Sequence, residues 1–190
     1  MSILPPNKLV PVAPLDAYLM DPDQFRDQWG AWLAPFSPPL PREGQVILAS
    51  YFGDVFVEDT QGAVWWVNGM EERVDRIAIN RDKALERISA ENLVMLKTKL
   101  LEQLIKGDML LPVGMLYGLR TPRSEGGKYH PDNVGTAPIA DALAYMGVRF
   151  RNANAAKPKP PEAAKAADTS KDKDIKDKDK GKSPFWGKKQ

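Results

Sequence analysis

The chain has 190 residues, the size of one ordinary domain, and its 43% apolar and 27% charged residues are typical of globular proteins. It has no cysteine, which excludes disulfides, thiolate nucleophiles and zinc sites built on cysteine. The net charge of +2 is uneven, because residues 152–190 hold 11 lysines against 6 acidic residues and the rest therefore carries −3.

The first segment, residues 1–14, contains four prolines and is expected to form an extended arm. Its prolines also interrupt the apolar helix that a secretion signal would need. No run in the chain approaches the roughly 18 apolar residues of a membrane span. These features predict a cytoplasmic protein without membrane contact.

A helix is predicted over residues 22–33, with Asp21 as its cap and Pro22 at its first position. Phe25, Trp29, Trp32 and Leu33 form an apolar stripe on this helix, and Phe25 and Trp29 are expected to pack on the sheet. The proline-rich run over residues 35–41 follows as a rigid connector.

Residues 45–78 predict a three-stranded antiparallel meander. Three runs rich in Val, Ile, Phe and Trp are separated by turn signals at residues 59–62 and at Asn68-Gly69. Within the first run, Gly53-Asp54 favours a bulge or turn with an exposed carboxylate over a paired active-site acid. Glu71 and Glu72 are expected as solvated charges at the hairpin tip.

Residues 81–106 predict one or two helices, the longest in the protein, as a lid on the meander. Asn80 or Asp82 would cap them, Leu85 and Ile88 would be buried, and Gly107 would end them. The buried stripe continues through Leu93, Leu96, Leu100 and Leu104. The solvent-facing side is predicted to hold Lys97, Lys99, Glu102 and Gln103.

A strand over residues 115–119 and a loop rich in turn signals come next. A short strand before Pro138 and a helix over residues 141–146, ended by Gly147, complete the domain. The predicted fold class is α+β, an antiparallel β-meander covered by helices, with a disordered C-terminal tail.

That tail, residues 152–190, lacks the apolar residues needed to form a core. Nearly every lysine in its KDKDIKDKDKGK run has an aspartate beside it, which favours a solubilising linker over a nucleic-acid-binding arm. Phe185-Trp186, near its end, indicates a short docking motif; the alternatives are that the pair folds back on the body or has no role.

No residue pattern indicates a catalytic, metal-binding or phosphate-binding site. His130 is the only histidine and has no partner at ligand or triad spacing, so it is expected as a surface loop residue. Residues 125–128 lack phosphate-loop spacing. We therefore predict no catalytic residue, cofactor or metal.

The side chains of a strand point alternately to its two faces, so one ring of Trp65-Trp66 is expected to face the core and the other to face outward. The alternative is that helices cover both faces. The candidate partner-binding residues are Trp65, Trp66, Phe185 and Trp186.

Three stretches, at residues 52–67, 76–78 and 117–134, resemble the type VI secretion immunity protein family, in the C-terminal domain type named after the immunity protein of a DNase effector. The resemblance covers about residues 15–151 and weakens beyond Asn133. The matching residues are Gly53, Asp54, Phe56, Gly62, Tyr117, Gly118, Pro122, Gly126, Gly127, Tyr129 and Asn133.

The resemblance implies a non-enzymatic bacterial protein that binds and neutralises a cognate effector toxin. The −3 charge of the body would complement the basic cleft of a nuclease. The alternative is a housekeeping ligand-binding, regulatory or scaffold domain. As a ligand-binding domain it would have a pocket between the meander and the loop over residues 117–133.

Overall fold

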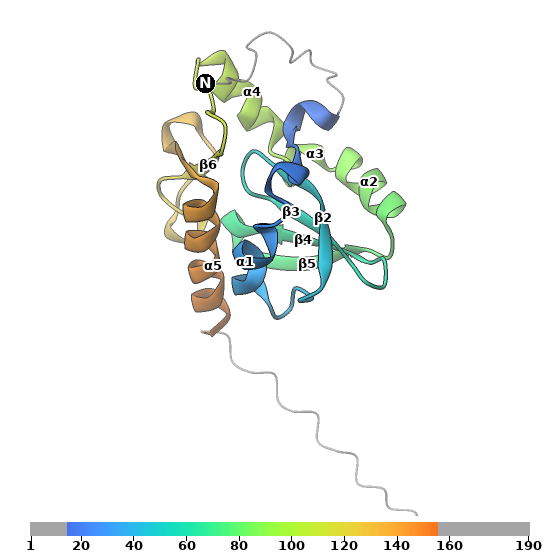
Figure 1. The fold of residues 1–190 in the computed structure, drawn as a ribbon. Coiled ribbons are helices and arrows are strands. Elements are labelled where there is room, and N and C mark those ends of the chain that lie inside the picture. The colour runs from blue at the N-terminus through green and yellow to red at the C-terminus, as the bar shows by residue number, and fades with distance from the viewer. Residues whose placement is uncertain (1–14, 156–190) are drawn as a thin grey trace, which may run out of the picture. The chain divides into compact units, whose positions relative to one another are not determined.

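The main sheet of this computed structural model has five antiparallel strands in the order β1-β2-β3-β4-β5. Residues 15–155 are described; the predicted arm at residues 1–14 and residues 156–190, with Phe185 and Trp186, lie outside the described residues. The strands are β1 (Leu19–Met20), β2 (Gly44–Ser50), β3 (Val55–Asp59), β4 (Val64–Asn68) and β5 (Arg73–Ala78) (Figure 1).

The meander predicted over residues 45–78 is antiparallel, as expected, but this stretch contributes four strands, β2 to β5, instead of three. The first apolar run divides at a tight turn between β2 and β3, where Gly53 takes a left-handed φ of +76°. The Ser50 hydroxyl accepts hydrogen bonds from the backbone N–H groups of Phe52 and Asp54 and so closes this turn. Gly53-Asp54 is thus a turn, one of the two predicted outcomes.

The Asn68-Gly69 turn has a different geometry from the predicted one. Asn68 is extended at φ −103°, and its side chain caps the short 3-10 helix η4 (Gly69–Glu71). The left-handed residue is Glu72, at φ 54°. Gly69 is required for another reason, because a Cβ there would lie 2.4 Å from Met146 Sδ.

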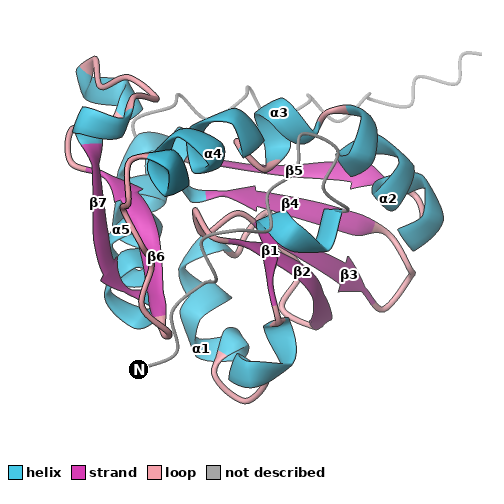
Figure 2. Ribbon diagram, turned by 90° about the horizontal axis from the view of Figure 1, so that it is seen from above, coloured by secondary structure: helices cyan, strands magenta, loops and turns pink. Residues whose placement is uncertain are grey.

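One face of the sheet is covered by α2 (Arg81–Ala90), α3 (Asn92–Met95) and α4 (Thr98–Lys106) (Figure 2). The predicted cap Asn80 accepts a hydrogen bond from the Lys83 N–H, and Gly107 ends α4 as expected. Leu85 and Leu93, predicted to be buried, are 37% and 65% exposed. Instead of a continuous stripe, the chain breaks at Lys97, whose φ is 52°.

The N-terminal segment forms four short helices, which are η1 (Leu15–Tyr18), η2 (Pro22–Phe25), α1 (Trp29–Leu33) and η3 (Ala34–Phe36). Trp29 and Leu33 of α1 lie beside Val46 of β2 and Val57 of β3, whereas Tyr18 of η1 donates a hydrogen bond to Glu102 of α4. The predicted single helix over residues 22–33 is therefore two, although Asp21 caps the first as expected. Trp29 is buried, and its indole N–H donates to the Pro22 carbonyl at 2.8 Å.

A second, two-stranded sheet pairs β6 (Met115–Leu119), at its predicted position, with β7 (Val134–Pro138). Helix α5 (Ile139–Ala155) follows and has 17 residues, so it, and not the helices over residues 81–106, is the longest in the described part of the chain. The sequence predicted that this helix ends at Gly147, but it continues to Ala155. It therefore also passes Asn152, the predicted start of the tail. A Cβ on Gly147 would lie 2.4 Å from Pro35 Cβ, so this glycine permits close helix packing.

The predicted class, an α+β fold with an antiparallel sheet covered by helices, is confirmed. Helix α5 contacts both the hairpin β6–β7 and the turn η4 of the main sheet. No helix within residues 15–155 is long and apolar enough to cross a bilayer.

Candidate functional site

A buried ion pair joins the main sheet to its helical cover. Lys97 Nζ lies 2.6 Å from Asp54 Oδ2, and the two side chains are only 5% and 1% exposed. The Ser50 hydroxyl donates to the same carboxylate at 3.0 Å, and the Trp66 indole N–H donates to its other oxygen at 3.3 Å. Two predictions are therefore wrong, namely the exposed carboxylate of Asp54 and the solvent-facing position of Lys97.

Local backbone geometry directs both charges inward. Lys97 has a left-handed backbone conformation at the junction between α3 and α4. At this junction its side chain points toward the main sheet and not toward solvent. Burial raises the pKa of Asp54, while the ammonium of Lys97 and the hydrogen bonds from Ser50 and Trp66 oppose that rise. Both oxygens of Asp54 accept hydrogen bonds, so we assign this pair a structural role.

Tyr129 lies beside this pair and links it to the surface. Its ring centroid is 5.7 Å from Lys97 Nζ and 5.1 Å from the Arg123 guanidinium. Its hydroxyl donates a short hydrogen bond to Glu71. Burial raises the pKa of Tyr129, and the carboxylate of Glu71 adds to that rise.

Of the two glutamates of the β4–β5 turn, Glu71 is exposed, as predicted, whereas Glu72 is not the solvated charge that the sequence predicted. Glu71 accepts the Tyr129 hydroxyl bond and lies 3.6 Å from Arg123 Nε. The side chain of Glu72 is 12% exposed and pairs with Arg149 of α5 at 2.8 Å. Both side chains fasten this turn to elements that follow much later in the chain.

A groove of about 490 Å³ opens beside Tyr129. We call it the Tyr129 groove, and its lining residues are Trp66, Asn68, Glu71, Arg73, Leu93, Val94, Lys97, Lys99, Leu100, Gln103, Tyr129 and His130. Two apolar side chains on its rim, Leu93 and Val94 of α3, are 65% and 66% exposed.

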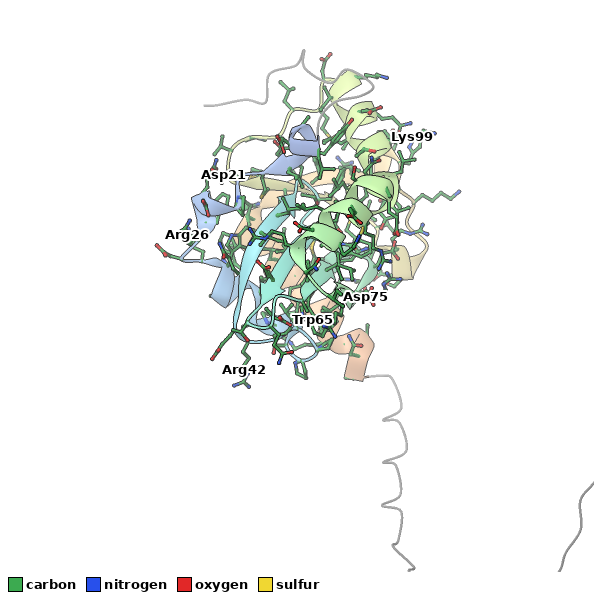
Figure 3. All side chains as sticks on the ribbon, turned by 90° about the vertical axis from the view of Figure 1, so that its right-hand side faces the viewer. Asp21, Arg26, Arg42, Trp65, Asp75 and Lys99 are labelled. Atoms are coloured by element: carbon green, nitrogen blue, oxygen red, sulfur yellow. The ribbon has the colours of Figure 1, made fainter. Side chains whose placement is uncertain are left out.

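The lining of the Tyr129 groove is basic. Three cationic residues, Arg73, Lys97 and Lys99, face a single acidic residue, Glu71. Arg73 and Lys97 have carboxylate partners, whereas Lys99, exposed on α4 (Figure 3), pairs with no acid among residues 15–155. The groove therefore offers apolar contact beside uncompensated positive charge.

The predicted tryptophan pair divides as period two requires. Trp66 faces the groove, is 4% exposed and stacks on Phe56 with ring centroids 6.3 Å apart. Trp65 points to the other face, is half-buried, and donates its indole N–H to Asp59 Oδ2 at 2.9 Å. Neither ring is a fully exposed anchor.

His130 lies on the groove rim and is exposed, as the sequence predicts for a surface loop residue. Its Nδ1 is 3.3 Å from Asp132 Oδ2. Within residues 15–155, no three side chains of His, Asp or Glu gather in a way that could hold a metal ion.

The residues that carry the family resemblance divide among several places. Asp54 and Tyr129 both contact Lys97, and Asn133 forms two hydrogen bonds with the Thr121 backbone in the loop that holds Tyr129. Gly127 belongs to the same loop, where a Cβ would lie 1.8 Å from the Thr121 carbonyl oxygen. The others shape turns or strands, or line a second cavity: Gly53, Phe56, Gly62, Tyr117, Gly118, Pro122 and Gly126.

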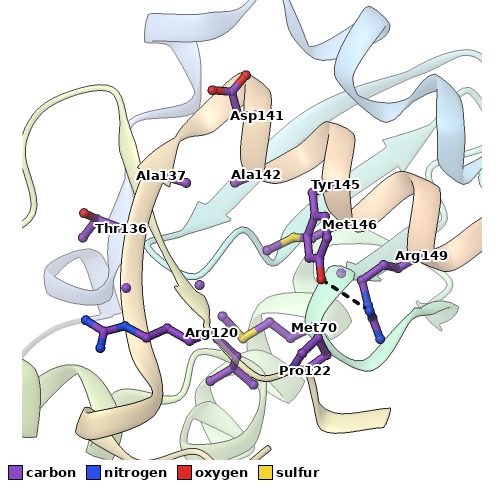
Figure 4. A pocket seen from close by; sticks show the side chains of 14 residues that line it. Met70, Arg120, Pro122, Thr136, Ala137, Asp141, Ala142, Tyr145, Met146 and Arg149 are labelled. Carbon is purple, nitrogen blue, oxygen red and sulfur yellow. Dashed lines mark hydrogen bonds between the residues drawn. The ribbon is translucent and has the colours of Figure 1, made fainter. Parts of the chain in front are cut away.

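The second cavity, of about 370 Å³, lies between α5, the hairpin β6–β7 and η4 (Figure 4). We call it the α5 cavity, and it shares no lining residue with the Tyr129 groove. It is lined by Gly69, Met70, Gly118, Leu119, Arg120, Pro122, Gly135, Thr136, Ala137, Asp141, Ala142, Tyr145, Met146 and Arg149.

The sequence reading missed Lys97, Leu93 and Val94 as site residues. One signal was present, because Lys97 lies four positions after Leu93 and three before Leu100, on the apolar stripe itself. A lysine on such a stripe needs a buried partner.

Searches of protein-family models, curated proteins and solved structures with this chain returned no match.

Proposed function

We propose that this chain is a non-enzymatic binding protein of the type VI immunity kind, which neutralises a cognate effector by occupying its surface. The observation that carries the proposal is the pair of exposed apolar side chains, Leu93 and Val94, on the rim of the Tyr129 groove. Apolar residues beside a concave surface are typical of protein-binding sites. The family resemblance supplies the biological role.

The partner segment that fits the groove combines apolar side chains with carboxylates. Its apolar part would cover Leu93 and Val94, while its acidic part would face Lys99. Charge complementarity of this kind mainly accelerates association and selects the partner. The mildly acidic body would not mask a basic nuclease cleft at this groove, because the groove lining is itself basic.

The biological part of the proposal is tested with the open reading frame next to this gene in its native host. Its product is expected to arrest growth when expressed alone, and co-expression of this chain is expected to restore growth. A neighbour without toxicity, or toxicity that this chain leaves unchanged, would overturn the immunity role.

The groove is tested with a matched pair of substitutions in the same residue type. Val94 and Val113 are both 66% exposed, but only Val94 lines the groove. Val94→Asp places a negative charge where the partner's carboxylates would lie and should weaken binding of the purified effector at least tenfold by calorimetry. Val113→Asp should change the affinity less than twofold. Equal affinities of the two variants would exclude this groove as the interface.

A further inference from the structure

The α5 cavity owes its volume to two glycines that face each other in the hairpin. Gly118 of β6 pairs with Gly135 of β7, so the sheet presents no side chain at that point. A Cβ on Gly118 would meet no atom within 4 Å. Neither glycine has a left-handed φ, so the backbone does not require glycine at these positions.

The wall opposite this glycine pair is apolar and adaptable. Helix α5 contributes Ala142, Met146 and the ring of Tyr145, and η4 contributes Met70. Methionine side chains adjust to irregular shapes and make favourable contacts with aromatic rings. A volume of about 370 Å³ is at the small end of the range for small-molecule sites. The shape therefore suits the flat ring or short branched chain of a small molecule.

Of the two arginines that line the cavity, one is occupied and one is available. Arg149 bonds to Glu72, Glu125, Ser124 and Tyr145. The exposed guanidinium of Arg120 has no ion pair or side-chain hydrogen bond within residues 15–155, although its backbone N–H donates to the Asn133 carbonyl. Figure 4 shows Arg120 and Asp141 on different edges of the cavity.

We propose that the α5 cavity binds a small amphipathic monocarboxylate. Its apolar body would lie over Gly118 and Gly135, and its carboxylate would accept hydrogen bonds from Arg120, whose planar guanidinium suits two-point contact. A single negative charge fits best, since Arg120 is the available cation and Asp141 on the other edge disfavours a second anion. This site goes beyond effector binding and shares no lining residue with the Tyr129 groove.

The test uses the full chain and three probes, phenylacetate, indole-3-acetate and 4-methylpentanoate, each beside its uncharged amide. At least one carboxylate should raise the melting temperature and bind with a submillimolar dissociation constant by calorimetry. The corresponding amide should bind at least tenfold more weakly. No binding by any carboxylate at millimolar concentration, or equal binding of acid and amide, would overturn the proposal.

Two substitutions locate the binding. Arg120→Gln should weaken the best probe at least tenfold, whereas Arg42→Gln, at another exposed arginine outside the cavity, should not. Gly118→Val places a branched side chain in the slot, where its Cβ would meet no atom within 4 Å, and should abolish binding while the melting temperature stays at or above the wild-type value. Unchanged affinity for the probe in either cavity variant would refute the site. The affinity of both variants for the effector is expected to equal that of the wild type, because the α5 cavity and the Tyr129 groove share no lining residue.

Discussion

Replacing Lys97 by Met tests the buried ion pair most directly. Methionine keeps most of the aliphatic length of lysine but removes the ammonium that lies 2.6 Å from Asp54. The carboxylate, 1% exposed, would then keep only the hydrogen bonds from Ser50 and Trp66. Leaving one partner of a buried pair alone typically costs about 3–5 kcal/mol. Since domains are stable by only about 5–15 kcal/mol, this loss would be a large part of the total.

The measurement is urea unfolding followed by tryptophan fluorescence, to which Trp66, bonded to Asp54, contributes. Lys99→Met is the matched control, because Lys99 is only two residues further along the chain, in α4, and is exposed; it should change the free energy of unfolding by less than about 0.5 kcal/mol. Adding Asp54→Asn to Lys97→Met should cost less than the sum of the two single losses. The reasoning is refuted if Lys97→Met is no more destabilising than Lys99→Met, or if the two losses simply add.

Two further predictions concern the packing of α5 and the response to acid. Gly147→Ala should lower the melting temperature, because overpacking against Pro35 typically costs about 1–3 kcal/mol and outweighs the better helix propensity of alanine; a higher melting temperature would show that α5 can move away. The Trp65 indole and two backbone N–H groups lower the pKa of Asp59, although burial opposes them. Its stabilisation is therefore present above about pH 4 and lost as the pH falls through the lowered value. Asp59→Asn should lose less stability than the wild type between pH 6 and pH 3 in thermal melts; parallel curves would contradict this.

Features that depend on local chemistry could be predicted from the sequence. Helix caps are one example, because they act on backbone groups within a few residues and can be predicted from a short stretch of sequence. They include Asp21 before Pro22, Asn80 before α2 and Gly107 after α4. Strand β6 was placed correctly for the same reason, since turn residues bound it on both sides.

The features that were missed depend on contacts between distant segments. Gly147 resembles a helix stop in isolation, but it permits contact with Pro35, more than a hundred residues earlier. Lys97 reads as a surface residue until Asp54 is brought beneath it. The sequence predicted a pocket between the meander and the loop over residues 117–133, but not a cavity against α5; the cause of that cavity, the pairing of Gly118 with Gly135, depends on strand register.

The short turn η4 has a thermodynamic consequence for the whole molecule. Gly69 and Met70 line the α5 cavity, while the next residue, Glu71, lines the Tyr129 groove and holds the Tyr129 hydroxyl. This one short turn thus forms part of the wall of both the α5 cavity and the Tyr129 groove. If a ligand in the α5 cavity shifts η4, the affinity of the Tyr129 groove for its partner changes. Thermodynamic linkage then requires that the partner change the affinity of the α5 cavity for its ligand by the same factor.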